Sequence, residues 1–244
     1  MIKKVVISAA GQGTRMLELT QEKSKHLISV LDKPFLAYLL DNILEAGYTE
    51  IILVVGFRED MIREFLKTYN SKNANITIVN QYEVLGPREK EYGTACPIKC
   101  VKELVGGENF ISLVGDNFYT VEDLQLMNID DDMNYVAGRK DEFPEKFGVL
   151  VGNGEFLEKI VEKPKAFVGD LVNTSLYKFT PAVFEKLPLI TKSPRGEYEI
   201  TDVISLLAQE KKVKIKKIND FWMDFGNPND IKKFSEYVNG TEKN

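Results

Sequence analysis

Short apolar strands alternate with amphipathic helices through the first half of this sequence, and this alternation constrains the fold more than any other feature. The apolar runs are β-branched and bounded by turn residues, as buried strands are. Pro34 suits the first turn of a helix, and Gly47 suits a helix end. The predicted strands are Val5–Ala9, Ile51–Val55, Ile76–Val79 and Phe110–Val114, and the predicted helices are Pro34–Glu45, Glu59–Tyr69 and Pro97–Leu104. This order predicts an α/β fold with a mostly parallel sheet and helices on both faces.

The second half of the sequence is richer in strands, which tight turns such as GNGE at Gly152–Glu155 connect. The predicted strands are Tyr135–Gly138, Phe147–Val151, Leu157–Val161, Leu171–Phe179 and Val213–Ile218, and the predicted helices are Ala182–Leu187, Ile200–Lys211 and Pro228–Val238. We expect a smaller, mixed, β-rich lobe packed on the first. Since no linker or repeat separates the halves, we predict one domain over residues 1–244, with lobes at 1–133 and 134–244.

Charge and hydropathy argue against two classes of partner. A net charge of −5 provides no excess of Lys and Arg for binding nucleic acid. No apolar run approaches the roughly 18 residues that a membrane span needs, and the N-terminal MIKKVVIS predicts a strand rather than a signal peptide. We therefore expect a cytoplasmic protein with no nucleic-acid or membrane partner, and a homo-oligomer is left open.

Two groups of side chains raise the question of a metal site. Cys96 and Cys100 have the i, i+4 spacing of a helix, but the chain has one histidine and no second cysteine pair. Reduced core thiols therefore fit better than a structural zinc site. The acidic run Asp130–Asp132 follows no predicted strand end, and we interpret it as solvated surface.

The stretch AAGQGTRM, from Ala9 to Met16, follows the first strand and predicts an anion-binding loop. It lacks the third glycine of a dinucleotide-binding fingerprint and the Gly-Lys-Ser/Thr of a P-loop. It does supply bare backbone amides at Gly11 and Gly13 and one fixed cation, Arg15, which together suit phosphates. A second cation, Lys25, follows ten residues later. The alternative is an ordinary turn with a surface arginine.

These residues carry a resemblance that extends along almost the whole chain. AAGQGTRM followed by SKHLISVLDKP is similar to the signature of the sugar-1-phosphate nucleotidyltransferases, also called nucleotide-sugar pyrophosphorylases. Further matches in the family's order are YGTA at Tyr92–Ala95, GDNFY at Gly115–Tyr119, FGVL at Phe147–Leu150, EKP at Glu162–Pro164, VNTSLYKF at Val172–Phe179, GEYEITD at Gly196–Asp202 and WMDFGNPND at Trp222–Asp230. The resemblance implies a Rossmann-like, nucleotide-diphospho-sugar transferase fold with a nucleotide-binding lobe and a sugar-binding lobe.

The resemblance also implies a reaction, in which a nucleoside triphosphate and a sugar 1-phosphate give a nucleotide sugar and pyrophosphate. One phosphate anion must attack another, so cations and positioning are the main requirements. Arg15 would hold the β- and γ-phosphates, and Lys25 would neutralise the α-phosphate. Asp116 and Asp224 match the family's two ligands for Mg²⁺, although an Asp before Asn or an aromatic residue is also common in turns. Residues expected to bind the nucleotide beside them are Ala10, Gly11, Gly13 and Thr14.

Base recognition is expected from the loop after the third strand. Gln81 offers an amide to a pyrimidine edge, and Gly93 and Thr94 leave room for backbone contacts. In this family a Gln with Gly-Thr favours UTP or dTTP. The run EVLGPREKEY makes the interval between Gln81 and Gly93 longer than is usual in the family, so Asn80 is a rival to Gln81 for contact with the base. A mobile surface hairpin is the alternative structure for this run. It also keeps open a cytidylyl- or guanylyltransferase.

The sugar 1-phosphate is expected to bind the β-rich lobe. By resemblance Glu162 accepts hydrogen bonds from sugar hydroxyls, Lys163 pairs with the phosphate, and Gly148 permits close approach of the ring. Asn173 and Tyr177 complete the predicted pocket, and Asn173 favours glucose or N-acetylglucosamine 1-phosphate. A departure from the family precedes the phosphate loop, where Ser8 replaces the leucine that is usual before Ala-Ala-Gly. A non-catalytic relative that binds nucleotide sugars is the remaining alternative.

Overall fold

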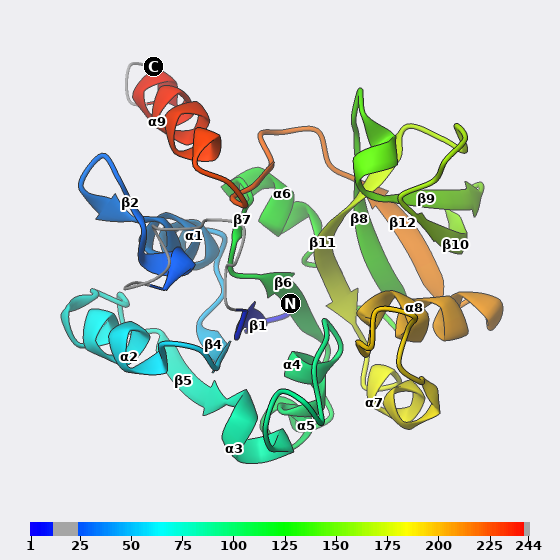
Figure 1. The fold of residues 1–244 in the computed structure, drawn as a ribbon, viewed down its shortest axis with the longest axis horizontal. Helices are drawn as coiled ribbons and strands as arrows, with labels where there is room; N and C mark the ends of the chain where they lie inside the picture. The colour runs from blue at the N-terminus through cyan, green and yellow to red at the C-terminus, as the bar shows by residue number, and fades with distance from the viewer. Residues whose placement is uncertain (12–23, 242–244) are drawn as a thin grey trace.

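The protein is built on one twisted sheet of nine strands, which Figure 1 shows running across the molecule. The structure is a computed structural model and describes residues 1–11 and 24–241. In spatial order the strands are β5 (Asn75–Asn80), β4 (Glu50–Val55), β1 (Lys4–Ala9), β6 (Phe110–Val114), β11 (Leu171–Phe179), β8 (Asn134–Lys140), β12 (Val213–Lys217), β10 (Phe156–Glu162) and β9 (Gly148–Asn153).

The sheet changes character at its middle. β5, β4, β1 and β6 are parallel, so their carboxyl ends meet at one edge, where open α/β sheets bind ligands. β11 then pairs antiparallel with β6 and with β8, and the strands beyond it are mixed. The predicted α/β class and the parallel first half are confirmed. The second half continues the same sheet, and its division into lobes at residues 133 and 134 stays a prediction.

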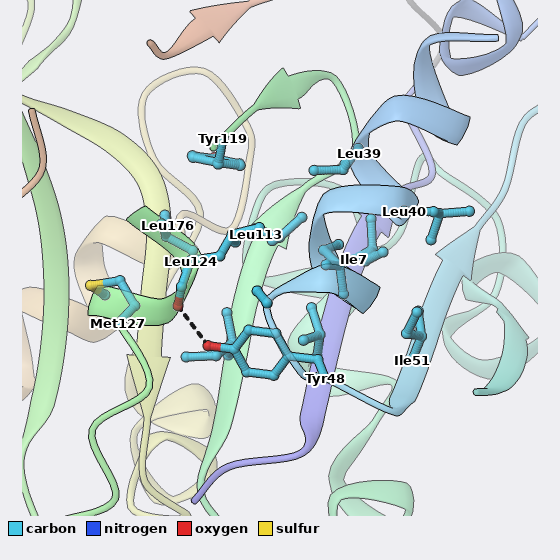
Figure 2. Packing of buried hydrophobic residues seen from close by; sticks show 14 of the residues in the cluster. Ile7, Leu39, Leu40, Tyr48, Ile51, Leu113, Tyr119, Leu124, Met127 and Leu176 are labelled. Carbon is cyan, nitrogen blue, oxygen red and sulfur yellow. Dashed lines mark hydrogen bonds between the residues drawn. The ribbon is translucent and has the colours of Figure 1, made fainter. Parts of the chain in front are cut away.

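One face of the parallel strands is covered by α1 (Phe35–Glu45), α2 (Glu59–Thr68) and α6 (Val121–Leu126). Alternate residues of each strand point to this face, because side chains in a strand alternate sides. Figure 2 shows Ile7 and Leu113 packed against Leu39 of α1. Tyr48 is fully buried there, and its phenol donates a hydrogen bond to the carbonyl of Leu124 over 2.8 Å. That bond satisfies the polar atom of a large core side chain.

The other face is covered by α4 (Cys96–Lys99), α5 (Lys102–Val105), α7 (Val183–Lys186) and α8 (Ile200–Gln209). The single helix predicted over Pro97–Leu104 is wrong, because the chain tightens at Val101, whose N–H bonds to the carbonyl of Ile98. Cys96 and Cys100 are free thiols, and burial raises the pKa of Cys96 to about 11. Within the described residues, no helix has both the length and the apolar character needed to cross a bilayer.

A third, aromatic cluster packs the terminal helix α9 (Asn229–Thr241) against α1 and against two small two-stranded sheets. Phe35 stacks on Phe225 with ring centroids 4.3 Å apart, and Phe118 lies 4.8 Å from Phe234. Short elements missed by sequence periodicity surround it, since two or three residues carry no period: η2 (Lys25–Leu27), β2 (Ser29–Val30), β3 (Lys33–Pro34), β7 (Asn117–Phe118) and β13 (Met223–Asp224). Other elements not predicted are α3 (Gln81–Leu85), α6, η3 (Pro144–Lys146) and η4 (Leu187–Leu189).

The acidic run Asp130–Asp132 is partly structural, which corrects its interpretation as solvated surface. The side chain of Lys178 is fully buried, and its ammonium donates to Asp131 Oδ1 at 3.0 Å and to two backbone carbonyls, those of Asp131 and Met133. Tyr135 also donates to Asp131, at 2.7 Å. Buried charges need such partners. This ion pair therefore anchors the turn between α6 and β8 to the centre of the sheet.

Replacing Lys178 with Met is expected to lower the free energy of unfolding by about 3 kcal/mol, because Asp131 and two carbonyls lose their charged donor. Urea denaturation followed by circular dichroism measures the change. Lys140→Met is the matched control, since Lys140 and Asp170 form an ion pair whose side chains are 73% and 50% exposed, and it should cost less than about 1 kcal/mol. Equal losses in the two variants would contradict a structural role for Lys178.

Candidate active site

A cavity of about 570 Å³ opens where the parallel strands end and the mixed strands begin. Its floor is formed by β1 and β6, and its walls come from β9, β10, β11 and the segment that leads into α8. Ser8, the predicted departure from the family, lies on the floor. Polar residues dominate the walls, and those with side chains of interest are Thr94, Lys146, Glu162, Lys163, Asn173, Ser175, Tyr177, Ser193, Arg195, Glu199, Asp202 and Asp224.

All five residues expected to bind the sugar 1-phosphate line this cavity: Gly148, Glu162, Lys163, Asn173 and Tyr177. Gly148 pairs with Glu162 across β9 and β10, and a Cβ at Gly148 would lie 3.0 Å from the Glu162 carboxylate. The glycine therefore leaves that carboxylate room over the strand. The amide of Asn173 donates to the phenol of Tyr177 at 2.9 Å, which orients both side chains. Their roles in binding stay predictions.

Lys25 and Asp116 form a largely buried ion pair at the carboxyl end of β6, with side chains 12% and 16% exposed. Burial raises the pKa of the Asp116 carboxyl, but the charge of Lys25 and its hydrogen bond outweigh burial, so the pKa lies below its usual value. The backbone of Gly11 comes close, since a Cβ there would lie 3.9 Å from Lys25 Nζ. Gly11, Lys25 and Asp116 thus gather beyond β1 and β6.

His26 beside this pair is buried and uncharged. Burial, with a further contribution from the charge of Lys25, lowers the pKa of His26 to about 3. Its Nδ1 lies 3.0 Å from the hydroxyl of Ser24. Because the ring carries no charge near neutral pH, Lys25 is the cation of η2 that faces the strand ends.

Asp224 is brought beside Asp116 by the pairing of β13 with β7. Asp224 lies opposite Asn117, and the N–H of Phe225 donates to the carbonyl of Asp116 at 2.7 Å. The described residues contain no cluster of three His, Cys, Asp or Glu side chains. Two carboxylates from neighbouring strands fit Mg²⁺, which takes one or two carboxylates and completes its shell with phosphate oxygens and water.

The predicted phosphate loop is only partly described. Ala10 is buried at the end of β1, and Gly11 follows it, half-buried. Gly13, Thr14 and Arg15 lie outside the described residues, and so their roles stay predictions.

Gln81 and its rival Asn80 have different surroundings. Gln81 begins α3 rather than lying in a loop, and it is buried. Its Oε1 meets no hydrogen-bond donor in the part of the chain that the structure covers. The Asn80 side chain instead accepts from the N–H groups of Tyr82 and Glu83 and donates to Glu59, so it caps α3. Neither residue lines the cavity.

Gly93 and Thr94 pack against the start of α8. Gly93 has φ +131°, and a Cβ there would lie 2.2 Å from the carbonyl oxygen of Tyr198, so only glycine fits. The hydroxyl of Thr94 accepts the N–H of Ile200 at 2.9 Å and so caps α8. The lengthened segment before Gly93 completes α3 and then forms turns rather than a hairpin, and Lys99 pairs with its Glu91 at 2.7 Å.

Comparison with known proteins identifies the family. The model of the family described as nucleotidyl transferase matches residues 4–240. The chain belongs to this family. UTP–glucose-1-phosphate uridylyltransferase AglF of Haloferax volcanii is 31% identical over 235 residues, which cover 93% of this chain and 93% of AglF. The predicted membership of the nucleotidyltransferases is confirmed.

Other relatives differ in length. Bifunctional protein GlmU of Methanococcus vannielii is 30% identical over 239 residues, which cover 95% of this chain and 54% of GlmU, so the chain spans about half of that relative. The solved structure of UDP-glucose pyrophosphorylase complexed with UDP-glucose matches with a TM-score of 0.85 at 22% identity, covering 99% of this chain and 100% of that chain. This similarity confirms the predicted fold.

Some residues line the cavity although the sequence did not predict them there, among them Lys146, Ser175, Arg195 and Glu199. Arg195 directly precedes the family run GEYEITD, and Glu199 lies within it, so position next to a recognised motif was the available signal. The ammonium of Lys146 lies over the ring of Phe143, 4.2 Å from its centroid. Ser175 interrupts the pairing of β11 with β8, which no periodicity reveals.

Ser175 has φ +58°, in the left-handed region that disfavours side chains. Ser175→Gly is therefore expected to raise the free energy of unfolding by about 0.5–1 kcal/mol, after the greater flexibility of unfolded glycine is allowed for, and to raise Tm by about 1–4 °C. Differential scanning calorimetry measures both. Ser205→Gly, within α8, is the control and should lower Tm. A lower Tm for Ser175→Gly would show that its hydroxyl contributes more than the strained backbone costs.

Proposed function

We propose that this protein transfers a nucleotidyl group from UTP or dTTP to glucose 1-phosphate or N-acetylglucosamine 1-phosphate, releasing pyrophosphate. The observation that carries the proposal is one cavity that Glu162, Lys163 and Asn173 line together with Asp224, at the carboxyl edge of the parallel strands. Asp224 in turn adjoins the Lys25–Asp116 pair through β7 and β13. A sugar phosphate and a nucleotide phosphate bound on these two sides would meet near Asp224.

The charges around this junction suit a reaction between two anions. Repulsion between the phosphates is the main barrier, and preorganised cations lower it most where charge concentrates. Lys146, Lys163 and Arg195 lie in the cavity wall, and Lys25 is fixed by Asp116. The sugar phosphate is itself the nucleophile, so alignment of the two phosphates replaces a covalent intermediate.

Asp116 and Asp224 would hold Mg²⁺, and the bound ion would neutralise phosphate charge. Lys25 would pair with the α-phosphate. Lys163 and Arg195 would orient the sugar phosphate. Arg15 stays the predicted partner of the leaving pyrophosphate. Together these residues hold the two anions without a nucleophilic side chain.

Sugar and base recognition follow from hydrogen-bonding capacity. The Glu162 carboxylate accepts from hydroxyl groups, and the Asn173–Tyr177 pair offers further polar atoms to a ring held against Gly148. On the other side, the unpaired, buried Oε1 of Gln81 suits the N3–H of uracil or thymine. The capping role of Asn80 supports Gln81 as the residue that reads the base.

A pyrophosphate-release screen tests the proposal directly. ATP, CTP, GTP, UTP and dTTP are each offered with glucose, N-acetylglucosamine and mannose 1-phosphates in the presence of Mg²⁺. We expect release with UTP or dTTP and with glucose or N-acetylglucosamine 1-phosphate. Release only with GTP or CTP would assign the chain to the alternative transferases, and no release with any pair would favour a non-catalytic binder.

Lys25→Ala is expected to reduce kcat by about 100-fold or more, because the charge acts where negative charge develops, while KM for both substrates changes by less than about three-fold. Steady-state kinetics with the best substrate pair measures the split. Lys33→Ala is the control, since Lys33 forms a half-exposed pair with Asp41 away from the cavity, and its kinetics should match the parent. Unchanged kcat in Lys25→Ala would remove this lysine from the reaction.

Asp224→Ala is expected to raise the Mg²⁺ concentration for half-maximal activity by about 10-fold or more, because loss of even a residue that only supports a metal ligand typically costs about 10- to 100-fold in affinity. Titration of activity with Mg²⁺ measures it. Asp170→Ala, which removes the exposed partner of Lys140, should leave the titration unaltered. A titration of Asp224→Ala that coincides with the parent would exclude Asp224 as a ligand.

A further inference from the structure

Glu199 joins the two sides of the cavity through its two carboxylate oxygens. It lies at the start of α8, is 7% exposed and lines the cavity. Its Oε1 accepts from Arg195 at 2.9 Å and from the hydroxyl of Ser193 at 3.0 Å. Its Oε2 accepts from the hydroxyl of Thr94 at 3.3 Å. One buried carboxylate thus holds a cation of the sugar-phosphate side and a residue of the nucleotide side.

Helix capping does not account for this arrangement. The Glu199 side chain makes no capping bond to its own helix. Thr94, from a distant part of the chain, caps α8 through the N–H of Ile200 instead. The carboxylate is therefore left to fix the position of Arg195.

Hydrogen bonds join the backbones of the two segments, residues 92–95 and 198–200. Tyr198 accepts from the N–H of Ala95 at 2.9 Å and donates to the carbonyl of Tyr92 at 2.8 Å. Gly93 lies directly against Tyr198, where no side chain fits. Lys99 and Lys192 both lie over the Tyr198 ring, 3.7 Å and 5.7 Å from its centroid. These contacts would carry a shift of residues 92–95 to residues 198–200, and the Glu199 carboxylate would carry it to Arg195.

Arg195 is suited to respond to such a shift. Its side chain is 55% exposed, and one nitrogen binds Glu199. A guanidinium has five N–H donors in a rigid fork, so it can bind a carboxylate and a phosphate together. The pose that Glu199 sets therefore decides whether the remaining donors face an anion in the cavity.

We propose that Glu199 is a positioning residue that couples the two substrate sites. A nucleotide bound against residues 92–95 orients Arg195 through Thr94 and Glu199, and so tightens the binding of the sugar 1-phosphate. The inference rests on the proposed function. By linkage the sugar phosphate must tighten nucleotide binding by the same factor.

Binding measurements without turnover test the coupling. The Kd of glucose 1-phosphate is measured by calorimetry with and without saturating α,β-methylene UTP, or with the corresponding pair that the substrate screen selects. We expect the nucleotide analogue to lower that Kd by about five-fold or more in the parent protein. We call the Kd without the analogue divided by the Kd with it the coupling ratio. In Glu199→Gln, which keeps the shape of the side chain but loses its charge, the coupling ratio should approach one. No coupling in the parent would overturn the proposal.

Kinetics separate positioning from a purely structural role. Glu199→Gln should raise KM for the sugar phosphate by about ten-fold and change kcat by less than about three-fold. The Kd of the nucleotide analogue measured without sugar phosphate should also change by less than about three-fold, because the coupling acts only when both ligands are present. Glu197→Gln removes a carboxylate from the same loop that does not line the cavity, and should behave as the parent. Loss of Tm with parallel changes in both KM values and an unchanged coupling ratio would show that Glu199 only stabilises the fold.

Arg195→Lys keeps the proposal testable if Glu199→Gln does not fold. This half-exposed side chain can be replaced with little effect on the core, but lysine lacks the rigid fork. Its coupling ratio should also approach one, and a parental ratio would overturn the proposal. The substrate screen judges the proposed function separately, since an active enzyme without coupling would refute the inference alone.

Discussion

The antiparallel pairing of β11 with β6 is the interaction on which the arrangement of this protein depends. It joins the parallel and the mixed strands into one sheet, with Leu176 opposite Leu113 and Phe179 opposite Phe110. The carboxyl ends of β1 and β6 therefore open beside the walls that β9, β10 and β11 supply. The cavity requires this proximity, because neither half of the sheet supplies all of its lining.

Three ion pairs of the described residues differ in whether their cation can also bind a ligand. The side chain of Lys178 is fully buried and donates to three acceptors at Asp131 and Met133, so it anchors a turn. Lys25 is fixed by Asp116 at the strand ends. Arg195 keeps exposed donors while Glu199 holds it. Because an enclosed cation has no capacity for a ligand, only the last two are suited to bind anions.

Much of the site could be predicted from local patterns. The strands that frame it have β-branched, apolar runs of ordinary length, and the residues Gly148, Glu162, Lys163, Asn173 and Tyr177 occur in runs typical of the family. What local patterns missed were short elements and partners. β7 and β13 contain two residues each, too few for a period, yet their pairing sets Asp224 beside Asp116. The capping of α8 by Thr94 joins residues 106 positions apart.

The sequence by itself determined the α/β class, the order of most strands and helices, the family and the chemical character of the cavity, because periodicity and short motifs are local properties of a chain. Tertiary structure alone decided that the strands of the second half extend the first sheet, that Asn80 and Thr94 are helix caps, and that Glu199 bridges two segments. Such roles depend on which donors and acceptors meet across the fold. Such hydrogen bonds join residues that are far apart in the sequence, and no local pattern encodes them.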